Sequence, residues 1–430
     1  MLRKATILFV ILCAAGMAFE LLGLRETSFG SEKKVLRIGA EGWQITEFKL
    51  LEHVAGFRAR HPDLRVEIYQ LPAGYETSIF LQAGLKDLAY DLIISANNYN
   101  IERYYKRKLV IAPVGLAGAG FEAAIVPGLL AGGQVTDQGQ TITYLLPFMG
   151  EVQTLNYRKD LLVEAGRERP PRTWQEFEEV AEALHTEFHR REGEAHKLYP
   201  IGLSLEQGGF FLQNTYLVLL RSLRGSVVDA DGHLDMTSPE AAEVFRMVKR
   251  WWKKGLIAPA SVAPGGAADD FKSGLTAMFP HWQSRGLWAL KNEKLAGKIG
   301  IAPAPQAHEV GSLVCVYGGV ILRGSKVERE AALFMTEVMC GAAEPDLIAA
   351  GKMPVRRARY QSAELPEWMR ELGPTMDKGY SAPEPMILFD MAEYISVAFH
   401  KYLRADSDDP SPMLQEAVLE SQRRVWNRPK

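Results

Sequence analysis

Two tryptophans with polar neighbours are the residues of this 430-residue chain best suited to hold a small solute. Trp43 lies in a glycine-flanked segment together with Glu41 and Gln44, whereas Trp282, after the pair Ala277-Met278, is singled out by the family resemblance given below. A flat aromatic ring covers the apolar face of a ligand ring, while a carboxylate or an amide satisfies hydroxyl groups. This combination predicts a binding site for a small polar solute.

No local motif for catalysis or metal binding accompanies these residues. The chain lacks the phosphate loop GxxxxGK[ST], the zinc signature HExxH, the nucleophile motif GxSxG and an EF-hand loop. Gly118-Ala119-Gly120 loosely matches a dinucleotide-binding fingerprint, but Pro113 and Pro127 interrupt the strand and helix that it requires. Acid/base catalysis by a pair of carboxylates stays open as an alternative, because 52 acidic residues always supply candidates. Nothing local therefore argues for an enzyme, a cofactor or a metal site, and the resemblance described below implies no catalysis.

The composition is typical of a globular protein with two domains. Lys and Arg number 50 against 52 Asp and Glu, a net charge of −2, which excludes general binding to nucleic-acid backbones. Hydrophobic residues make up 47% of the chain, and single cores stop growing beyond about 250–300 residues. Cys315 and Cys340 have no partner at metal-ligand spacing. They are predicted to be buried thiols, with one disulfide as the alternative in an exported chain.

The amino terminus has the pattern of an export segment. Arg3 and Lys4 precede an uncharged run over residues 5–19, and the small residues Gly16 and Ala18 suit a signal peptidase. Residues 1–30 are therefore predicted to be a signal peptide or an N-terminal anchor, with lipidation at Cys13 as a further alternative. In each case the body of the chain is expected to be periplasmic or otherwise extracytoplasmic.

Alternating strands and helices are expected to position the candidate residues. Strand patterns at 35–38, 64–68 and 92–94 alternate with helix patterns at 48–57 and 79–85, which predicts an α/β fold with a largely parallel sheet. Ligand-binding loops lie at the carboxyl ends of such strands. The turn at 39–43, Tyr75 and Asn97 fall in these loops.

Longer helices dominate after Pro147. The capping box at 173–176 and the pair Ser238-Pro239 predict two helix starts, the second helix ending at Gly255. Strands are expected at 299–302 and 313–322, the latter interrupted by Gly318-Gly319, and helices at 386–403 and 413–426.

Four collinear groups of segments resemble the extracellular solute-binding proteins of ABC importers, the family that includes the maltodextrin-binding proteins. The groups are 146–162 with 171–177; 271–278 with Trp282; 299–305 with Gly318-Gly319 and 330–334; and 351–356. The resemblance implies a two-lobed periplasmic-binding-protein fold of a type II-like kind with a hinge between the lobes. It implies an N-lobe of 31–146 plus 308–370 and a C-lobe of 147–307 plus 371–430.

The resemblance, with the strand-end loops, also implies a ligand site in the cleft between the lobes. The predicted ligand-binding residues are Glu41, Trp43, Gln44, Tyr75, Asn97, Glu151, Asn214, Tyr216, Trp282, Gly318 and Arg356. Asn214 stands where maltodextrin receptors have an acidic residue, which argues against maltodextrin itself.

The function that the resemblance implies is capture of a sugar or oligosaccharide by hinge closure. The expected protein is a monomer that delivers its solute to an ABC permease in the membrane, without nucleic acid. Three alternatives stay open: the same fold with a charged solute held by Arg285 or Arg356, an exported carbohydrate-active enzyme, and an anchored sensor domain.

Overall fold

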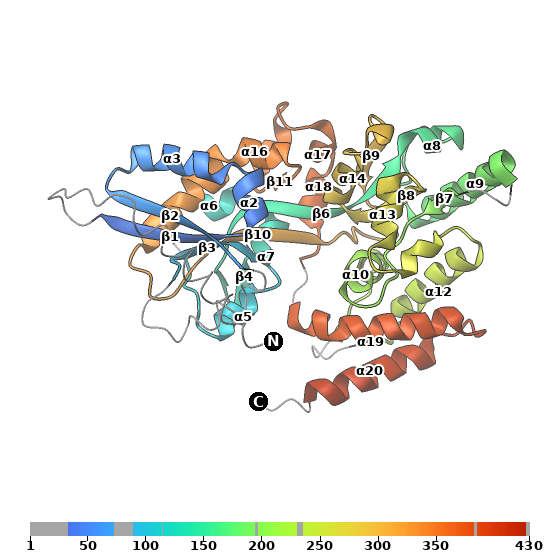
Figure 1. Cartoon of the computed structure of the whole chain (residues 1–430). Coiled ribbons are helices and arrows are strands. Elements are labelled where there is room, and N and C mark those ends of the chain that lie inside the picture. The colour runs from blue at the N-terminus through green and yellow to red at the C-terminus, as the bar shows by residue number, and fades with distance from the viewer. Residues whose placement is uncertain are drawn as a thin grey trace, which may run out of the picture.

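The structure is a computed structural model that describes residues 33–72, 89–113, 115–193, 197–229, 235–381 and 385–426. The export segment at 1–30, the helix predicted at 79–85 and Tyr75 lie outside these residues. Figure 1 shows two lobes side by side, connected by long strands. No helix in the described ranges is long and apolar enough to cross a bilayer.

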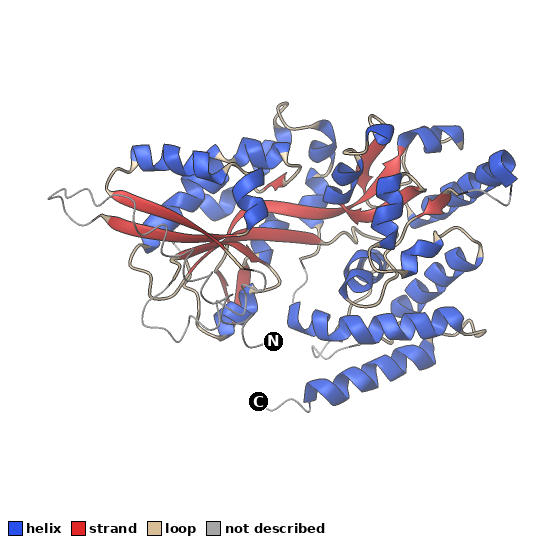
Figure 2. Cartoon of the chain, in the orientation of Figure 1, coloured by secondary structure: helices blue, strands red, loops and turns tan. Residues whose placement is uncertain are grey.

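One sheet extends through both lobes (Figure 2). Among the described residues it has nine strands in the order β2-β1-β3-β10-β6-β8-β7, with β9 and β11 also paired to β6. The strands are β1 (Lys34–Ala40), β2 (Leu64–Gln70), β3 (Leu92–Asn97), β6 (Leu146–Arg158), β7 (Tyr199–Ile201), β8 (Thr276–Trp282), β9 (Ile299–Pro303), β10 (Val314–Ile321) and β11 (Met353–Pro354). A separate hairpin is formed by β4 (Gln134–Asp137) and β5 (Gln140–Thr143).

The first lobe is the part built on β1, β2, β3, β10 and the first half of β6. Strands β1, β2 and β3 are parallel, as predicted, whereas β10 is antiparallel to both β3 and β6. The sheet is therefore less parallel than expected, because a chain segment returning from the second lobe inserts between β3 and β6. At that insertion a Cβ on Gly318 would lie 2.2 Å from the Leu145 side chain, so this glycine permits a close approach.

The second lobe is built on the second half of β6. Strands β8 and β9 pair antiparallel with β6, and the short β7 is parallel to β8. Thr173 caps α9 as predicted, because its hydroxyl accepts the Glu176 amide at 3.0 Å. The reciprocal half of the predicted capping box is replaced, since the Glu176 carboxylate accepts the Arg172 amide at 2.9 Å. Helix α12 begins after Ser238 and ends before Gly255, as predicted.

Helices cover the sheet in both lobes. Those of the first lobe include α2 (Gly42–Glu47), α3 (Leu50–Arg60), α5 (Ile101–Lys106), α6 (Phe121–Ala124), α7 (Pro127–Gly132), α15 (Glu328–Phe334), η6 (Met335–Ala342), α16 (Glu344–Ala349), η7 (Arg357–Gln361), α17 (Glu367–Glu371) and α18 (Gly373–Lys378). The second lobe has α8 (Lys159–Glu164), α9 (Trp174–Glu192), α10 (Gly209–Phe211), η3 (Leu212–Tyr216), α11 (Leu217–Ser222), α12 (Pro239–Lys253), η4 (Pro259–Val262), α13 (Gly266–Ser273), α14 (Gln283–Ala289), η5 (Glu293–Leu295), α19 (Pro385–Arg404) and α20 (Ser411–Trp426). Strands and helices thus form an α/β fold with two lobes.

Each lobe has its own hydrophobic core. Leu36, Ile93, Phe148 and Val320 belong to the first core, and Leu155, Phe177, Phe245 and Trp251 to the second. Cys315 and Cys340 are free, buried thiols, and the Cys340 thiol donates to the Pro147 carbonyl at 3.1 Å. The prediction of buried thiols is confirmed, and the alternative of a disulfide between them is wrong in this structure.

Candidate functional site

A cleft of about 870 Å³ is lined by residues from both lobes. Its walls are formed by α2, β10, α16 and the segment after α16 in the first lobe, and by α10 and α14 in the second. The lining residues are Trp43, Glu47, Lys49, Glu151, Phe210, Trp282, Ser284, Arg285, Leu287, Trp288, Lys291, Tyr317, Asp346, Ala349, Ala350 and Lys352.

Aromatic rings contribute to both walls of the cleft. Trp43 and Tyr317 form an edge-to-face pair in the first lobe, with ring centroids 6.3 Å apart. Trp282 and Trp288 line the opposite wall, where Trp282 is 9% exposed and Trp288 is 46% exposed. Rings on two facing walls can cover both faces of a flat solute.

The start of α2 holds Trp43 in place. The Trp43 indole Nε1 donates to the Glu41 carboxylate at 2.7 Å, and the Glu41 amide donates to the Gln44 side-chain carbonyl at 3.1 Å. Gln44 is fully buried and donates to the Ile94 carbonyl at 3.2 Å. The turn predicted at 39–43 is therefore wrong: β1 continues to Ala40 and α2 begins at Gly42, because Glu41 and Gln44 form a capping box.

An enclosed ion pair lies on the floor of the cleft. Lys352 Nζ is 2.7 Å from the Glu151 carboxylate, and the two side chains are only 12% and 14% exposed. The same ammonium lies 4.9 Å from the centre of the Trp43 ring. Lys352 thus neutralises Glu151 and adds a cation–π contact to the first-lobe wall.

Helix α14 carries most of the second-lobe wall, and its inner face fixes its position. The Gln283 side-chain carbonyl accepts the Val152 amide at 2.8 Å, which ties the helix to β6. A Cβ on Gly286 would lie 2.3 Å from the Asn156 side chain, so only glycine allows this spacing. With that face held, Trp282, Arg285 and Trp288 are positioned along the cleft.

Two predicted residues lie in the second-lobe interior. Asn214 is 1% exposed and accepts from the Gln153 amide at 3.1 Å, while its own amide nitrogen is 3.0 Å from His281 Nε2. Burial and the nearby Arg285 charge hold the pKa of His281 well below its usual range, so the imidazole is neutral. Tyr216 packs between Phe211 and Phe245. Neither Asn214 nor Tyr216 lines the cleft.

Three other predicted residues also lie away from the cleft lining. The Asn97 side chain accepts the Tyr99 amide at 3.0 Å, which is turn chemistry at the end of β3. Gly318 permits the close packing of Leu145, and Arg356 forms a backbone bridge with Ile125. Of the predicted set, the structure therefore brings Trp43, Glu151 and Trp282 to the cleft and places Glu41 and Gln44 behind Trp43. Tyr75 lies outside the described residues.

Several lining residues were not selected from the sequence. Lys352 belongs to the 351–356 segment, but the choice there fell on Arg356, because nothing local shows which of two cations points inward. Trp288 follows Trp282 by six residues, and Tyr317 precedes Gly318-Gly319 in the apolar strand. The glycine pair that interrupts this strand was a usable signal for the aromatic residue beside it, Tyr317.

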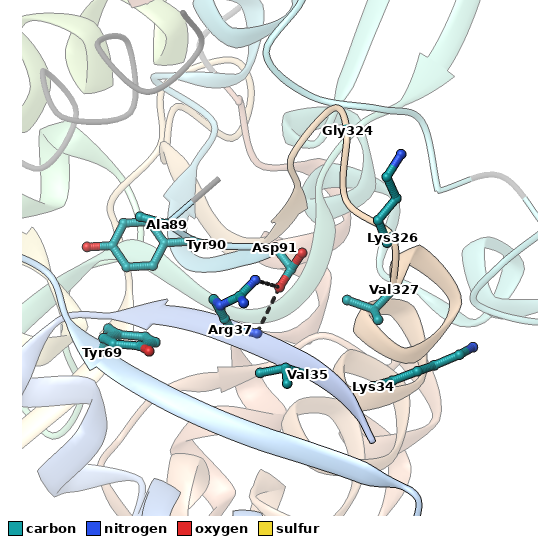
Figure 3. A pocket seen from close by; sticks show the side chains of 10 residues that line it. All are labelled: Lys34, Val35, Arg37, Tyr69, Ala89, Tyr90, Asp91, Gly324, Lys326 and Val327. Carbon is teal, nitrogen blue, oxygen red and sulfur yellow. Dashed lines mark hydrogen bonds and ion pairs between the residues drawn. The ribbon is translucent and has the colours of Figure 1, made fainter. Parts of the chain in front are cut away.

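A second cavity, of about 820 Å³, lies wholly within the first lobe (Figure 3). Figure 3 shows Arg37 and Asp91 facing each other, and the Arg37 amide donates to the Asp91 carboxylate at 3.0 Å. Tyr69 and Tyr90 lie beside them with ring centroids 5.9 Å apart. This cavity is near the amino end of β1, opposite to the end that leads to Trp43, and no described residue of the second lobe lines it.

Comparison with known families agrees with this architecture. The family described as bacterial extracellular solute-binding protein matches residues 46–338. A probable ABC transporter-binding protein of Deinococcus radiodurans is 28% identical over 198 residues, which are 44% of this chain and 45% of that relative. The match thus spans less than half of the relative.

Solved structures show the same fold over almost the whole chain. The maltose-bound MalE3 of T. maritima is 20% identical, with a TM-score of 0.72 over 90% of this chain and 99% of that one. The sugar-binding protein MalE of Xanthomonas citri is 19% identical, with a TM-score of 0.73 over 92% of this chain and 100% of that one. The prediction of a two-lobed fold is therefore confirmed.

Proposed function

We propose, because the chain belongs to the family of bacterial extracellular solute-binding proteins, that it is the substrate-binding receptor of an ABC importer and captures a sugar or oligosaccharide. The observation that carries this proposal is the pair of aromatic walls that face one cleft from two lobes. The names of the similar proteins, a maltose-bound and a sugar-binding MalE, support the same class of solute.

Sugar rings match the chemistry of these walls. A pyranose has apolar faces that stack on aromatic rings and equatorial hydroxyls that need hydrogen-bond partners at its edge. Glu151, Lys352, Ser284 and Arg285 supply polar groups between the rings. Such partners give selectivity, because an analogue that lacks a hydroxyl leaves them unpaired in an enclosed site.

Closure of the lobes around the solute is part of the proposal. Strand β6 crosses between the lobes, and the segment around Tyr380 crosses beside it, because the Val314 amide donates to the Tyr380 carbonyl at 3.0 Å. A few crossing segments allow rotation of two intact cores about a hinge. Small-angle scattering on ligand addition should show the radius of gyration falling, and an unchanged radius at saturation would contradict closure.

Export and delivery complete the proposed role. Residues 1–30 act as a signal peptide or anchor, the receptor works outside the cytoplasm as a monomer, and it hands its solute to a membrane permease. Similarity to the probable ABC transporter-binding protein of Deinococcus radiodurans supports the transporter partner. Replacing residues 1–30 by an unrelated cleavable signal should leave solute binding unchanged, since the described cleft lining begins at Trp43.

The central experiment identifies the solute directly. Native mass spectrometry of the purified protein should reveal a co-purified carbohydrate, and calorimetry with that carbohydrate should give saturable binding at one site per chain. Incubation with the same carbohydrate should yield no cleavage products. A co-purified amino acid or metal complex, with no carbohydrate bound from a broad panel, would overturn the proposal.

A further inference from the structure

Arg285 differs from the other charged groups of the cleft. Lys49 is 2.8 Å from the Asp346 carboxylate, and Lys352 is 2.7 Å from that of Glu151. Glu47 and Lys291 are exposed, so water solvates them. Arg285 alone among the lining cations is partly buried and has no ion pair to any described residue.

The Arg285 guanidinium is held in place without satisfying its donors. Its Cζ atom lies 3.8 Å from the centre of the Trp288 ring, a stacked cation–π arrangement. Its Nε–H is enclosed and has no acceptor among the described residues. A guanidinium has five N–H donors and no acceptor. Burial lowers the pKa of Arg285 from its usual value, while the charge of Glu151 acts in the opposite direction.

Glu151 does not serve as the missing partner. Its carboxylate is already bound by Lys352, so its charge is compensated within the first lobe. The cleft therefore keeps one uncompensated, partly buried positive charge, fixed on the second-lobe wall by α14. An enclosed cation of this kind is costly unless an anion binds it. A single guanidinium beside a compensated carboxylate matches one negative charge, and its planar fork matches a carboxylate with two parallel hydrogen bonds.

We infer that the solute is an acidic sugar, a uronate or an oligosaccharide containing one, whose carboxylate is bound by Arg285 while its ring lies against the tryptophans. This inference rests on the proposed function, because it assigns the class of sugar that the same cleft accepts. Arg285 is on this basis the specificity-determining residue, and Trp288 orients it.

The experiment compares matched neutral and acidic probes by calorimetry. Xylotriose is paired with glucuronosyl-xylotriose, and maltotriose, trigalacturonate and trimannuronate extend the panel. Wild-type protein is expected to bind an acidic probe at least about tenfold more tightly than its neutral counterpart. This first arm needs no variant and so does not depend on the folding of one.

Variants then test the residue. Arg285→Met should weaken the acidic probe about tenfold to a hundredfold and change any neutral probe less than about threefold. Arg285→Lys, which keeps the charge and loses the planar fork, should lie between them. Lys294→Gln removes a similar charge on the exposed segment after α14, outside the cleft lining, and should leave acidic-probe binding unchanged.

Each outcome decides between the two proposals. Preference for an acidic probe that depends on Arg285 supports the inference. Binding of neutral probes alone, or acidic binding that Arg285→Met leaves intact, overturns the inference and leaves the sugar receptor standing. Absence of binding to every carbohydrate of the panel overturns the inference, and it overturns the sugar receptor as well when the co-purified solute is not a carbohydrate.

Discussion

The two walls of the cleft are built on different principles. In the first lobe the main polar groups near Trp43 have internal partners: the indole donates to Glu41, Glu151 pairs with Lys352, and Asp346 pairs with Lys49 and His53. In the second lobe Trp288 is 46% exposed, and the lining residue Arg285 is only partly buried and has no ion pair to any described residue. The first wall is therefore a preformed platform, whereas the second wall holds groups that a ligand must complete.

This difference teaches where binding energy and selectivity should arise. A platform with satisfied polar groups offers shape and apolar area to many flat rings. A guanidinium without an internal acceptor gains the most binding energy from a matching ligand, because it loses no internal hydrogen bond on binding. Substitutions on the two walls should therefore differ in how much they lower the unfolding free energy and how much they lower the affinity for the solute.

The largest effect is expected for Trp282→Ala, on the second wall. Trp282 is only 9% exposed and belongs to the second core. Its loss should therefore lower the unfolding free energy by about 3–5 kcal/mol. Affinity in the folded protein should fall about tenfold to a hundredfold. Trp174→Ala is the control, because Trp174 is an equally buried core residue outside the cleft. Equal affinity in the two variants would reassign Trp282 to packing alone.

Lys352→Met tests whether the first wall depends on internal pairing. Removal of one partner leaves the Glu151 charge enclosed, which should lower the unfolding free energy by about 3 kcal/mol in urea titrations. Adding Glu151→Gln should restore most of it. Lys34→Met, which removes a lysine that is 63% exposed from its pair with Glu330, should cost less than about 1 kcal/mol. If both lysine variants lost the same unfolding free energy, the ion pair on the floor of the cleft would be as well solvated as a surface ion pair.

Trp288→Ala should separate binding from stability on the second wall. Because nearly half of the side chain is exposed, unfolding free energy should change by less than about 0.5 kcal/mol. Affinity for the co-purified solute should fall about threefold to tenfold, since one ring face and the support for Arg285 are lost. Leu290→Ala removes a comparably exposed apolar residue outside the cleft lining. Its binding isotherm should match wild type, and a matching isotherm for Trp288→Ala would exclude this ring from the site.

The smallest effect concerns the pH dependence of the first wall. Hydrogen bonds from Lys49 and His53 hold the pKa of Asp346 below its usual 3.8. A carboxyl whose pKa is lower in the folded state contributes stability above the unfolded pKa and loses it as pH falls through the folded one. Asp346→Asn should therefore flatten the acid side of the stability profile slightly, with little change in solute affinity. A steeper acid limb in the variant would contradict this assignment.

Local signals predicted the elements better than the site. The capping residues Thr173 and Ser238 and the repeating apolar positions fix helix starts through contacts within a few residues, and the structure contains those helices. Glu41 and Gln44 show the limit: a helix cap and a ligand contact require the same polar side chains at the same spacing. Only the buried hydrogen bond from Gln44 to the Ile94 carbonyl distinguishes the helix cap from a ligand contact.

The remaining site residues depend on long-range pairing. Lys352 reaches Glu151 across 201 positions of the chain, and Asn214 becomes an interior residue because Gln153 and His281 close around it. No local pattern records which strand will lie beside which. The lobe boundaries and the ligand contacts therefore stay predictions, whereas the family and the two-lobed fold are established.

The position of β10 also dictates an order of events during synthesis. This strand lies between β3 and β6, yet it is made only after the second-lobe segment from 159 to 303 has been synthesised. The first lobe cannot close its sheet from its own leading segment, because its central strand is still missing. A nascent chain of this design stays open until late in translation, and pairing over such sequence distances is intrinsically slow. For the export proposed above, the topology thus provides a delay in which the unfolded chain can still pass through a membrane.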